Sequence, residues 1–379
     1  MNNKHTFWDN MPQEIVEDRS MVKELGYNNV ISIPQLKETI TEECFDVGDE
    51  DYFTSLEKFL GQHYTNGNFL KLYPKELLMY FMNSGLRNLY IIIKCNVTGN
   101  IIGHICGVLR DFCIGNMQKT FWYVNFLCVD NRYRNEEVAP FLITRFYNAI
   151  DRPAIFHTSR TIPKSVSTQT YYCRPLNIEK LIKHGYFQLP KDEELQKKYI
   201  TRLKSHFHTS DNGSMLSFNK FDGDVDDFVS QLNTYNAERY LIRTLVHNKD
   251  ITGILRNPHF RTYKITDANT RVVGYIDFYI VNETQMVNEI LNETVKDTVR
   301  HAYIYNKYLQ TVSEINVLNS LCEHLYAHNE DIDIISILSQ PDNCSLKNGK
   351  FLQKYSLNTH FFNHSMVKVS TVENGLMPF

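Results

Sequence analysis

The chain has 379 residues, of which 42% are hydrophobic and 22% are charged, and its formal net charge is −3. This length predicts two domains, or at most three, with ordinary hydrophobic cores. The small negative charge lacks the basic footprint of a nucleic-acid-binding protein. The sequence contains no apolar run of about 18 residues that would indicate a transmembrane helix. Its first residues, MNNKHTFWDNMPQE, lack the apolar core of a signal peptide. We therefore expect a cytoplasmic protein that binds no nucleic acid.

The first hundred residues predict an arm, two helices and a hairpin. Residues 1–20 form the expected arm, which carries one aromatic pair, Phe7-Trp8, suited to docking on the rest of the chain. Apolar residues at helical spacing and turn signals predict helices at 49–64 and 75–83 and a hairpin of strands at 88–95 and 101–110.

Residues 121–143 contain the clearest structural unit of the sequence. Phe121–Val129 is a nearly unbroken apolar and aromatic run, which predicts a buried strand. A polar turn at 130–135 follows, and Val138 begins a helix that reaches about Ile150, with a proline in its first turn. Because the start of a helix presents free backbone N–H groups, this unit predicts an anion site suited to a phosphate-bearing cofactor.

The remaining pattern predicts further elements and one linker. Before residue 190 we expect a strand at 154–158, a polar loop at 163–174 and a helix at 176–184. The polar, charged stretch 190–214 reads as a linker between domains. Within it, His206-Phe207-His208 lacks a third ligand at metal-binding spacing, so we expect a solvated strand and no metal.

The second half repeats the order of elements found in the first. Its pattern predicts helices at 224–234, 236–247 and 313–328, strands at 259–266, 272–281, 301–306 and 333–338, and a helical segment at 350–355. Two halves with one order of elements suggest an internal duplication. We therefore predict domains at 1–190 and 191–379, with the first holding the cofactor.

Several motifs together resemble one known family. The strand-and-helix unit contains VNFLCV followed by an arginine-bearing turn and VAPFLI, which resembles the signature of eukaryotic N-myristoyltransferases. HTFWDNMP, FHTSRTIPKSVSTQTYYCRPLNIEKLI, GYIDFYIV, HAYIYN and the final GLMPF resemble further segments of that family. The family consists of two tandem GNAT-like domains related by a pseudo-two-fold axis, and it transfers myristate from myristoyl-CoA to the N-terminal glycine of proteins. The short chain and its AT-rich type of composition suggest a viral form.

The resemblance also implies a role for particular residues. Contacts to the CoA nucleotide would come from Thr6, Phe7 and Trp8. The backbone N–H groups of Phe126 and Leu127 would form the oxyanion hole for the thioester carbonyl. The rest of the CoA site would be lined by Cys128, Val129, Arg134, Asn135, Glu137, Val138 and Ala139. Residues near the acceptor glycine would be Asn125, Thr158, Tyr171 and Tyr279. The terminal carboxylate of Phe379 would be the base, and the enzyme would act as a monomer without a metal.

Some positions depart from the family pattern. The phosphate turn carries Glu136-Glu137 where the family has Lys-Arg. Two like charges about 4 Å apart cost about 4 kcal/mol at an effective dielectric constant of 20, so a carboxylate that faces phosphate would oppose CoA binding. If both side chains turn to solvent, the backbone N–H groups stay available. On the peptide side, the family's acidic loop is reduced to TNGN at 65–68, and KYSLNTHFF at 354–362 replaces a glycine-rich motif.

These departures leave two further interpretations open. One is a catalytically inactive protein that kept the fold and binds an acyl-CoA or a protein partner in an assembly role. The other is an N-acetyltransferase that uses acetyl-CoA, because Arg134 and Ala139 fit the looser R-x-x-x-x-A turn. The resemblance over the whole chain argues against the acetyltransferase, so the leading hypothesis is N-myristoyl transfer to glycine-initiated peptides.

Overall fold

The structure is a computed structural model. It describes residues 6–9, 11–17, 23, 25, 40–46, 48–66, 69–208, 216–285, 298–310, 312–328, 330–339, 346, 350–376 and 378. The elements before residue 190 are α1 (Thr6–Asp9), β1 (Gln13–Val16), β2 (Ile40–Phe45), α2 (Glu50–His63), β3 (Thr65–Asn66), β4 (Phe69–Leu72), α3 (Lys75–Asn83), β5 (Arg87–Cys95), β6 (Ile101–Ile114), β7 (Met117–Val129), η2 (Asn131–Tyr133), α4 (Val138–Ala149), β8 (Ala154–Thr158), β9 (Ser167–Pro175) and α5 (Ile178–Lys183). The later elements are α6 (Glu193–His208), β10 (Ser217–Lys220), α7 (Val225–Arg239), β11 (Ile242–Thr244), α8 (Asn248–Arg256), β12 (Phe260–Thr266), β13 (Val272–Gln285), β14 (Val299–Leu309), α9 (Glu314–Ala327), β15 (Ile334–Leu338), β16 (Leu352–Phe362), β17 (His364–Val367) and η3 (Thr371–Glu373).

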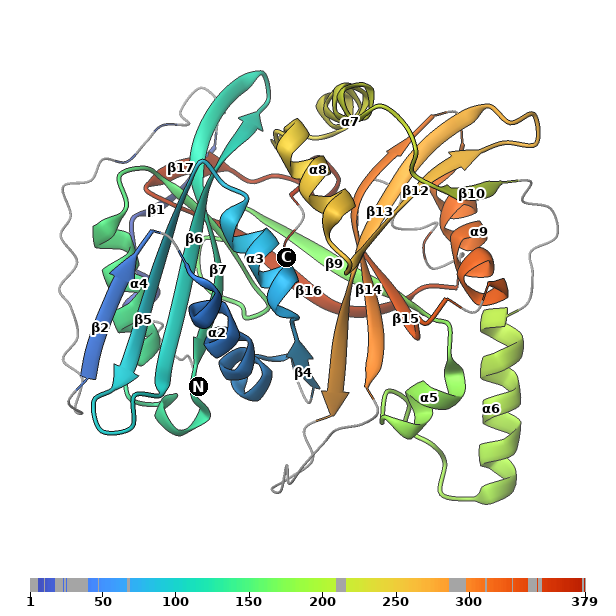
Figure 1. Ribbon diagram of the computed structural model, residues 1–379, viewed down its shortest axis with the longest axis horizontal. Coiled ribbons are helices and arrows are strands. Elements are labelled where there is room, and N and C mark those ends of the chain that lie inside the picture. Colours follow the sequence, from blue (N-terminus) through green and yellow to red (C-terminus); the bar gives the residue numbers. More distant parts are fainter. Residues whose placement is uncertain are drawn as a thin grey trace.

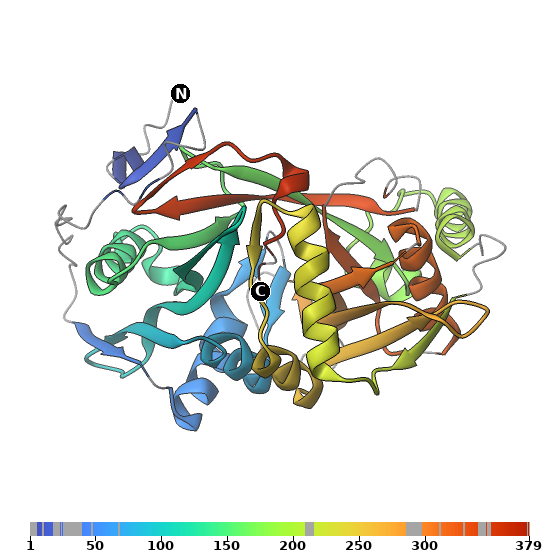
Figure 2. The ribbon, with the colours of Figure 1, turned by 90° about the horizontal axis from the view of Figure 1, so that it is seen from above.

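One mixed sheet of 15 described strands runs through both halves of the chain (Figure 1). Its main order is β10-β12-β13-β14-β15-β9-β16-β8-β7-β6-β5-β2, while β11 pairs with β6 and β4 pairs with β13. The halves are interleaved, since β16 lies between β8 and β9, and β9 lies between β16 and β15. Figure 2 shows the long strands β9 and β16 crossing between the halves. The predicted mixed α/β fold is confirmed, and the division at residue 190 stays a prediction.

Helices cover both faces of the sheet around β7. Trp122 and Val124 pack in the same cluster as α4, whereas their neighbours Phe121 and Tyr123 pack in the cluster that contains α2 and α3. This alternation is the period of two expected of a strand buried on both faces. The sheet therefore separates α4 from α2 and α3. Among the described residues, no helix is long and apolar enough to cross a membrane.

Two segments expected to be non-strand are strands in the structure. The predicted polar loop 163–174 is largely β9, and the predicted helical segment 350–355 is part of β16. These two strands pair with each other along most of their length. The local sequence of each is ambiguous, and pairing with a partner about 185 residues away decides the outcome.

The stretch predicted to be a linker is mostly a helix. Within residues 190–214, α6 spans Glu193–His208, so the expectation of a solvated strand at His206-Phe207-His208 is wrong. Phe207 is buried, and its backbone oxygen accepts a hydrogen bond from the buried Arg174. Charged residues can occupy the solvent-exposed face of a helix while a few apolar residues pack its other face against the rest of the protein. The predicted helix 236–247 is likewise replaced by the end of α7 and by β11.

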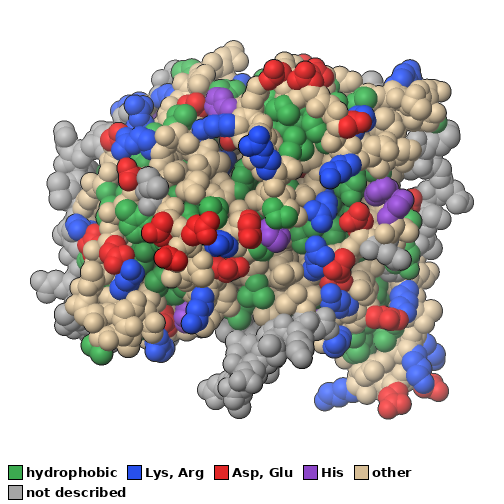
Figure 3. Space-filling view, in the orientation of Figure 1, with side chains coloured by type: hydrophobic (Ala, Val, Ile, Leu, Met, Phe, Trp, Pro, Cys, Tyr) green, Lys and Arg blue, Asp and Glu red, His purple; other side chains and the backbone are tan. Residues whose placement is uncertain are grey.

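Acidic and basic side chains are interspersed over the face of the molecule shown in Figure 3. This mixture agrees with the formal net charge of −3. Electrostatic recognition on this face therefore depends on local groups, because neighbouring charges of opposite sign largely cancel at long range and salt screens what remains.

A buried carboxyl group lies between β13 and β14. Asp277 is fully buried at an irregularity in this pairing, and it accepts hydrogen bonds from the backbone N–H of Asn306 at 2.8 Å and from its side-chain amide at 2.9 Å. Burial raises the pKa of Asp277 to about 7, against the opposing effect of these hydrogen bonds. The folded chain therefore retains this proton at pH values where the unfolded chain has lost it.

We expect this carboxyl group to make the protein less stable as the pH rises from about 4 to about 7. In that range the folded state binds a proton that the unfolded state does not, so each pH unit lowers the free energy of unfolding by about 1.4 kcal/mol. Asp277→Asn removes the titration and keeps an acceptor for Asn306. Urea midpoints at pH 5 and pH 7.5 should differ less for Asp277→Asn than for the wild type; equal differences would contradict this assignment.

Candidate active site

The pairing of β6 with β7 is interrupted near the end of β7. Cys106 lies opposite Asn125 and His104 lies opposite Cys128, so the single residue Ile105 faces both Phe126 and Leu127. Phe126 has a φ of 50°, in the left-handed region that side chains other than glycine rarely adopt. An extra residue on one strand defines a β-bulge, which disrupts the ladder locally and redirects the strand. The bulge therefore falls on the two residues predicted to form the oxyanion hole.

The bulge also changes the face to which the side chains of β7 point. Trp122 and Val124 pack on the α4 side, and strict alternation would send Phe126 there as well. Instead, Phe126 packs in the cluster on the opposite side. Its ring lies 5.2 Å from that of Tyr73, edge to face, and 5.9 Å from that of Tyr64. The extra residue thus aims Phe126 at a group of buried tyrosines.

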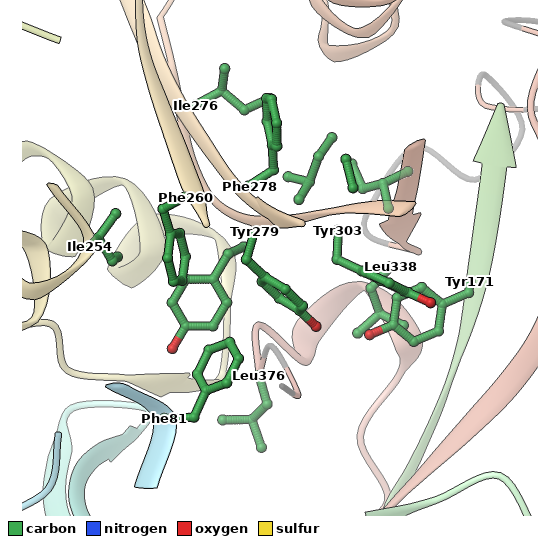
Figure 4. Close-up of a cluster of buried hydrophobic side chains, with 14 of the residues drawn as sticks. Phe81, Tyr171, Ile254, Phe260, Ile276, Phe278, Tyr279, Tyr303, Leu338 and Leu376 are labelled. Atoms are coloured by element: carbon green, nitrogen blue, oxygen red, sulfur yellow. The ribbon is translucent and has the colours of Figure 1, made fainter. Parts of the chain in front are cut away.

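These tyrosines bring together residues from both halves of the chain. Tyr279 on β13 stacks on Tyr303 of β14 at 5.4 Å, and Tyr171 on β9 meets Tyr303 at 5.9 Å (Figure 4). Burial raises the pKa of Tyr73, Tyr279 and Tyr171 above the ordinary value, and neighbouring tyrosine hydroxyls add to each shift. All three therefore stay neutral. The structure thus places two predicted acceptor-side residues, Tyr171 and Tyr279, in one cluster beside the bulge.

The other two predicted acceptor-side residues flank this region on β7 and β8. Asn125 immediately precedes the bulge, and its side-chain Nδ2 is buried with no hydrogen-bond partner in the structure. Such a donor is costly to leave unpaired. Thr158 ends β8, is half-buried, and accepts a hydrogen bond from the backbone N–H of Arg160 at 3.0 Å. Asn125 therefore has a free donor to offer a ligand.

The last described residues of the chain run into the centre of the molecule. Asn374 bridges to Ile242 on β11, and the N–H of Gly375 donates to the oxygen of Ile242 at 2.8 Å. Leu376 is fully buried and belongs to the same apolar cluster as Phe81 and Tyr279 (Figure 4). Phe379, predicted to supply the catalytic carboxylate, lies outside the described residues.

The turn between β7 and α4 uses its cationic side chains within the protein. Asp130 is buried and pairs with Arg132 at 2.7 Å, and it also accepts a hydrogen bond from the backbone N–H of Arg132. Arg134 donates to the backbone oxygens of His63 at 2.7 Å and of Val129 at 3.4 Å. These contacts fix the turn, so a phosphate would meet backbone N–H groups rather than unengaged arginines.

The start of α4 shows where the predicted cofactor residues lie. Glu137 is exposed and takes a left-handed φ of 59°, directly before the buried Val138 that begins the helix. Asn135 is also exposed, whereas Cys128 and Val129 are buried at the end of β7. Glu136 and Ala139 are half-buried. The side chain of Glu137 is thus exposed, while the backbone N–H of Glu136 donates to the oxygen of Tyr133 at 3.2 Å. The backbone N–H groups at the start of the helix are those of Val138 and Ala139.

The aromatic pair of the N-terminal arm docks on the sheet. Trp8 stacks on Phe156 of β8 at 5.6 Å and on Phe362 of β16 at 6.2 Å, and Phe7 meets Trp8 edge to face at 5.3 Å. The side chain of Thr6 lies outside the described residues. The arm is therefore held where β8 and β16 pair, and its predicted contact with a nucleotide stays a prediction.

A buried charged cluster borders the tyrosines and was not predicted. Glu283 is 1% exposed and accepts hydrogen bonds from Tyr303 and Tyr186 at 2.6 and 2.5 Å. His301 Nδ1 lies 3.0 Å away and Lys354 Nζ lies 3.7 Å away, while Lys71 is paired opposite Glu283 across β4 and β13. A glutamate inside the apolar strand GYIDFYIVNET was the available signal, because a buried carboxylate needs partners.

Comparison with known proteins agrees with this geometry. The family described as myristoyl-CoA:protein N-myristoyltransferase, N-terminal domain, matches residues 26–173. A crystal structure of Saccharomyces cerevisiae N-myristoyltransferase with bound myristoyl-CoA superposes with a TM-score of 0.75 over 99% of this chain and 96% of the yeast chain, at 19% identity. This chain therefore has the mixed α/β fold of the yeast protein.

Sequence comparison extends the match beyond the N-terminal region. Glycylpeptide N-tetradecanoyltransferase 2 of Bos taurus is 22% identical over 325 residues, which cover 81% of this chain and 63% of the bovine protein. Glycylpeptide N-tetradecanoyltransferase of Aspergillus fumigatus is 24% identical over 355 residues, which cover 88% of this chain and 70% of the fungal protein. The chain thus spans about two thirds of the length of these relatives. It belongs to the N-myristoyltransferase family as a distant member.

Proposed function

We propose that this chain transfers a myristoyl group from myristoyl-CoA to the N-terminal glycine of acceptor peptides. The observation that carries the proposal is the bulge at Phe126 and Leu127, which interrupts the β6–β7 ladder next to the tyrosine cluster in which Leu376 also packs. The names of the relatives and the yeast structure with bound myristoyl-CoA support the same reaction. A cytoplasmic location, a monomeric state and a viral source are further parts of this proposal.

The proposed reaction needs no covalent enzyme intermediate. The glycine amine attacks the thioester carbonyl, an amide bond forms, the C–S bond breaks and CoA leaves as a thiol. An α-amine has a pKa of about 8, so a base must take its proton near neutral pH. In this proposal the terminal carboxylate of Phe379 is that base. The N–H groups of Phe126 and Leu127 stabilise the oxyanion, each by about 2.7–4 kcal/mol as in other oxyanion holes.

The acyl-CoA site is proposed along the end of β7 and the start of α4. The backbone N–H groups of Asn135, Val138 and Ala139 would meet the pyrophosphate, since a helix start favours anions. The exposed side chain of Glu137 is compatible with this, and Thr6, Phe7 and Trp8 would lie against the nucleotide. The proposed acceptor contacts are Asn125, Thr158, Tyr171 and Tyr279.

One observation favours a second candidate function. Both arginines of the turn are engaged within the protein, and Glu136 adds negative charge where a pyrophosphate would bind. A protein that kept the fold but holds an acyl-CoA or a protein partner without turnover would tolerate this arrangement. Binding and turnover must therefore be measured separately.

We expect the protein to transfer labelled myristate from myristoyl-CoA to a panel of glycine-initiated peptides. Deleting Phe379 should lower this rate without changing acyl-CoA binding, because only the base is displaced. Myristoyl-CoA at about 100 times its Kd should stabilise the fold by about 2.7 kcal/mol in a thermal shift assay. A shift without transfer to any peptide would favour a protein that binds acyl-CoA without turnover. The absence of both would contradict the transferase and leave only the protein-binding role.

A further inference from the structure

A buried histidine contacts the bulge from the neighbouring strand. His104 on β6 is 0% exposed and lies opposite Cys128, one position from the interruption of the ladder. Its Nδ1 lies 2.8 Å from the backbone oxygen of Phe126, and its Nε2 lies 2.7 Å from the hydroxyl of Tyr52 on α2. His104 thus links helix α2 to the residue with the left-handed backbone.

The partners of His104 define its protonation state. A backbone oxygen can only accept, so Nδ1 must carry the proton and donate to Phe126. Burial lowers the pKa of His104 to about 4, although the hydrogen bond to Phe126 acts in the opposite direction. The ring is therefore neutral, and Nε2 accepts from Tyr52, whose own pKa is raised well above the ordinary value by burial. The hydrogen bonds run in one direction, from Tyr52 through His104 to Phe126.

The acceptor of this chain belongs to the same peptide group as a predicted catalytic donor. The oxygen of Phe126 and the N–H of Leu127 share one planar peptide unit, and in a trans peptide they point in opposite directions. None of the described peptide bonds is cis. Because the Phe126 oxygen is held pointing toward His104, the Leu127 N–H must point in the direction opposite to His104. Donation to the oxygen also polarises the unit, which strengthens the N–H as a donor.

We propose that His104 and Tyr52 are positioning residues that hold the Phe126–Leu127 peptide so that the Leu127 N–H points at the thioester oxygen. This inference rests on the proposed function of the bulge as an oxyanion hole. Neither side chain touches the reacting atoms. Their effect passes through the peptide unit alone.

The residues that pack around Phe126 and Tyr52 hold this hydrogen-bonded chain rigidly. A left-handed phenylalanine is strained and persists only where its surroundings hold it. The ring of Tyr52 is itself held edge to face by Phe45 and Phe53, each at 4.9 Å. Because α2 fixes Tyr52 and Tyr52 fixes His104, the direction of the Leu127 N–H is set before a substrate binds. Such preorganisation is what makes an oxyanion hole effective.

Three variants test the proposal against a matched control. His104→Phe keeps a ring but removes the donor, His104→Asn keeps a donor near the position of Nδ1, and Tyr52→Phe removes the hydroxyl. Tyr90→Phe is the control, because Tyr90 also packs on Tyr52 and loses buried hydrogen bonds to Met82 and Asn83, but it does not contact the bulge. Each folded variant is assayed for kcat, for the KM of myristoyl-CoA and for the Kd of a non-hydrolysable thioether analogue.

We expect His104→Phe to lower kcat by about 10- to 100-fold with the KM and the analogue Kd within about twofold, since only a transition-state contact is misdirected. His104→Asn should recover most of kcat, Tyr52→Phe should lower it by a few-fold, and Tyr90→Phe should leave it unchanged. An unchanged kcat in His104→Phe, an increase in KM alone, or an equal loss in Tyr90→Phe would overturn the proposal. If His104→Phe does not fold, His104→Asn and Tyr52→Phe still decide.

A second measurement separates this inference from the proposed reaction. The sequence contains five Phe-Leu peptide bonds, so labelling phenylalanine carbonyls with ¹³C and leucine nitrogens with ¹⁵N isolates five amide signals. One of them belongs to Leu127, and its absence from a Leu127→Ile sample assigns it. We expect that signal to shift in His104→Phe and Tyr52→Phe but not in Tyr90→Phe. If it shifts and the wild type shows no transfer, the proposed function fails; if it stays, the positioning role fails.

Discussion

Replacing Glu283 with glutamine should destabilise the protein by about 3–5 kcal/mol, because it leaves the buried ammonium group of Lys71 and the half-buried one of Lys354 without their counter-charge. Lys71 is 8% exposed and lies over the ring of Tyr303 at 4.4 Å, and Lys354 is the second ammonium of the cluster. Several interactions favour the ionised form of Glu283 and hold its pKa well below the ordinary value against burial; the largest are with His301 and Lys354. Glutamine keeps the shape of the side chain, removes the charge and leaves only one oxygen to accept from Tyr303 or Tyr186.

The measurement for Glu283→Gln is the urea midpoint at pH 7, with Glu179→Gln as the matched control. Glu179 pairs with Lys204 on the surface, where such pairs contribute little, so its midpoint should not move. Adding Lys71→Met to Glu283→Gln should recover part of the loss, since it removes one uncompensated ammonium. If Glu283→Gln is as stable as the wild type, the carboxylate does not hold the cluster together.

The pH dependence of this variant has a defined sign. Burial lowers the pKa of Lys71 to about 8 in the wild type, and Glu283 acts against that shift. Without Glu283 the pKa of Lys71 should fall further. Protonation of Lys71 then opposes folding over a wider range, so Glu283→Gln should gain stability as the pH rises toward 8, more than the wild type does.

Adding a single methyl group at Gly107 should cost about 1–3 kcal/mol and weaken acyl-CoA binding. A Cβ on Gly107 would lie 2.2 Å from Phe146 Cζ and 2.6 Å from its Cε2. Phe146 is 1% exposed and also packs edge to face on Trp122, so its ring has little room to move. The strain falls on α4, which carries Phe146 and whose first turn is the proposed cradle of the pyrophosphate.

The measurements for Gly107→Ala are the thermal midpoint and the KM for myristoyl-CoA, with Gly61→Ala as control. A Cβ on Gly61, within α2, would meet Leu72 Cδ2 at an ordinary 3.5 Å. Alanine is favoured over glycine by about 1 kcal/mol inside a helix, so this control should be neutral or stabilising. Combining Gly107→Ala with Phe146→Leu should relieve the contact. If Gly107→Ala is as stable as the wild type and has a normal KM for myristoyl-CoA, the position of α4 does not depend on the absence of a side chain at Gly107.

The sequence predicts elements best where local signals agree with the final pairing. The helix 75–83 and the strand 154–158 are found with the predicted bounds, because Pro74 starts the helix and a short apolar run defines the strand. β9 and β16 were missed because each is buried by the other and carries polar residues such as Gln169 and Thr359 in its interior. Such residues look like loop until their distant partners are known.

In the candidate site, too, the sequence predicts what local motifs define and misses what distant partners define. Phe126, Leu127, Tyr171 and Tyr279 were reached through motifs, and the structure brings both tyrosines into one cluster beside the bulge. The bulge itself, the contact of His104 with Tyr52 and the cluster around Glu283 depend on partners that lie 20 or more residues apart. The signal available in the sequence was a polar residue inside an apolar strand, which indicates that a partner exists without saying which.

The interleaving of β8, β16 and β9 also constrains the order in which the protein can be completed during translation. β8 and β9 leave the ribosome first, but β16, which pairs with both, comes from Leu352–Phe362, about 180 residues after β9. Contacts of such large sequence separation slow folding and leave strand edges open in the meantime. The half that is synthesised first must therefore keep a gap in its sheet until residues 352–362 have been made.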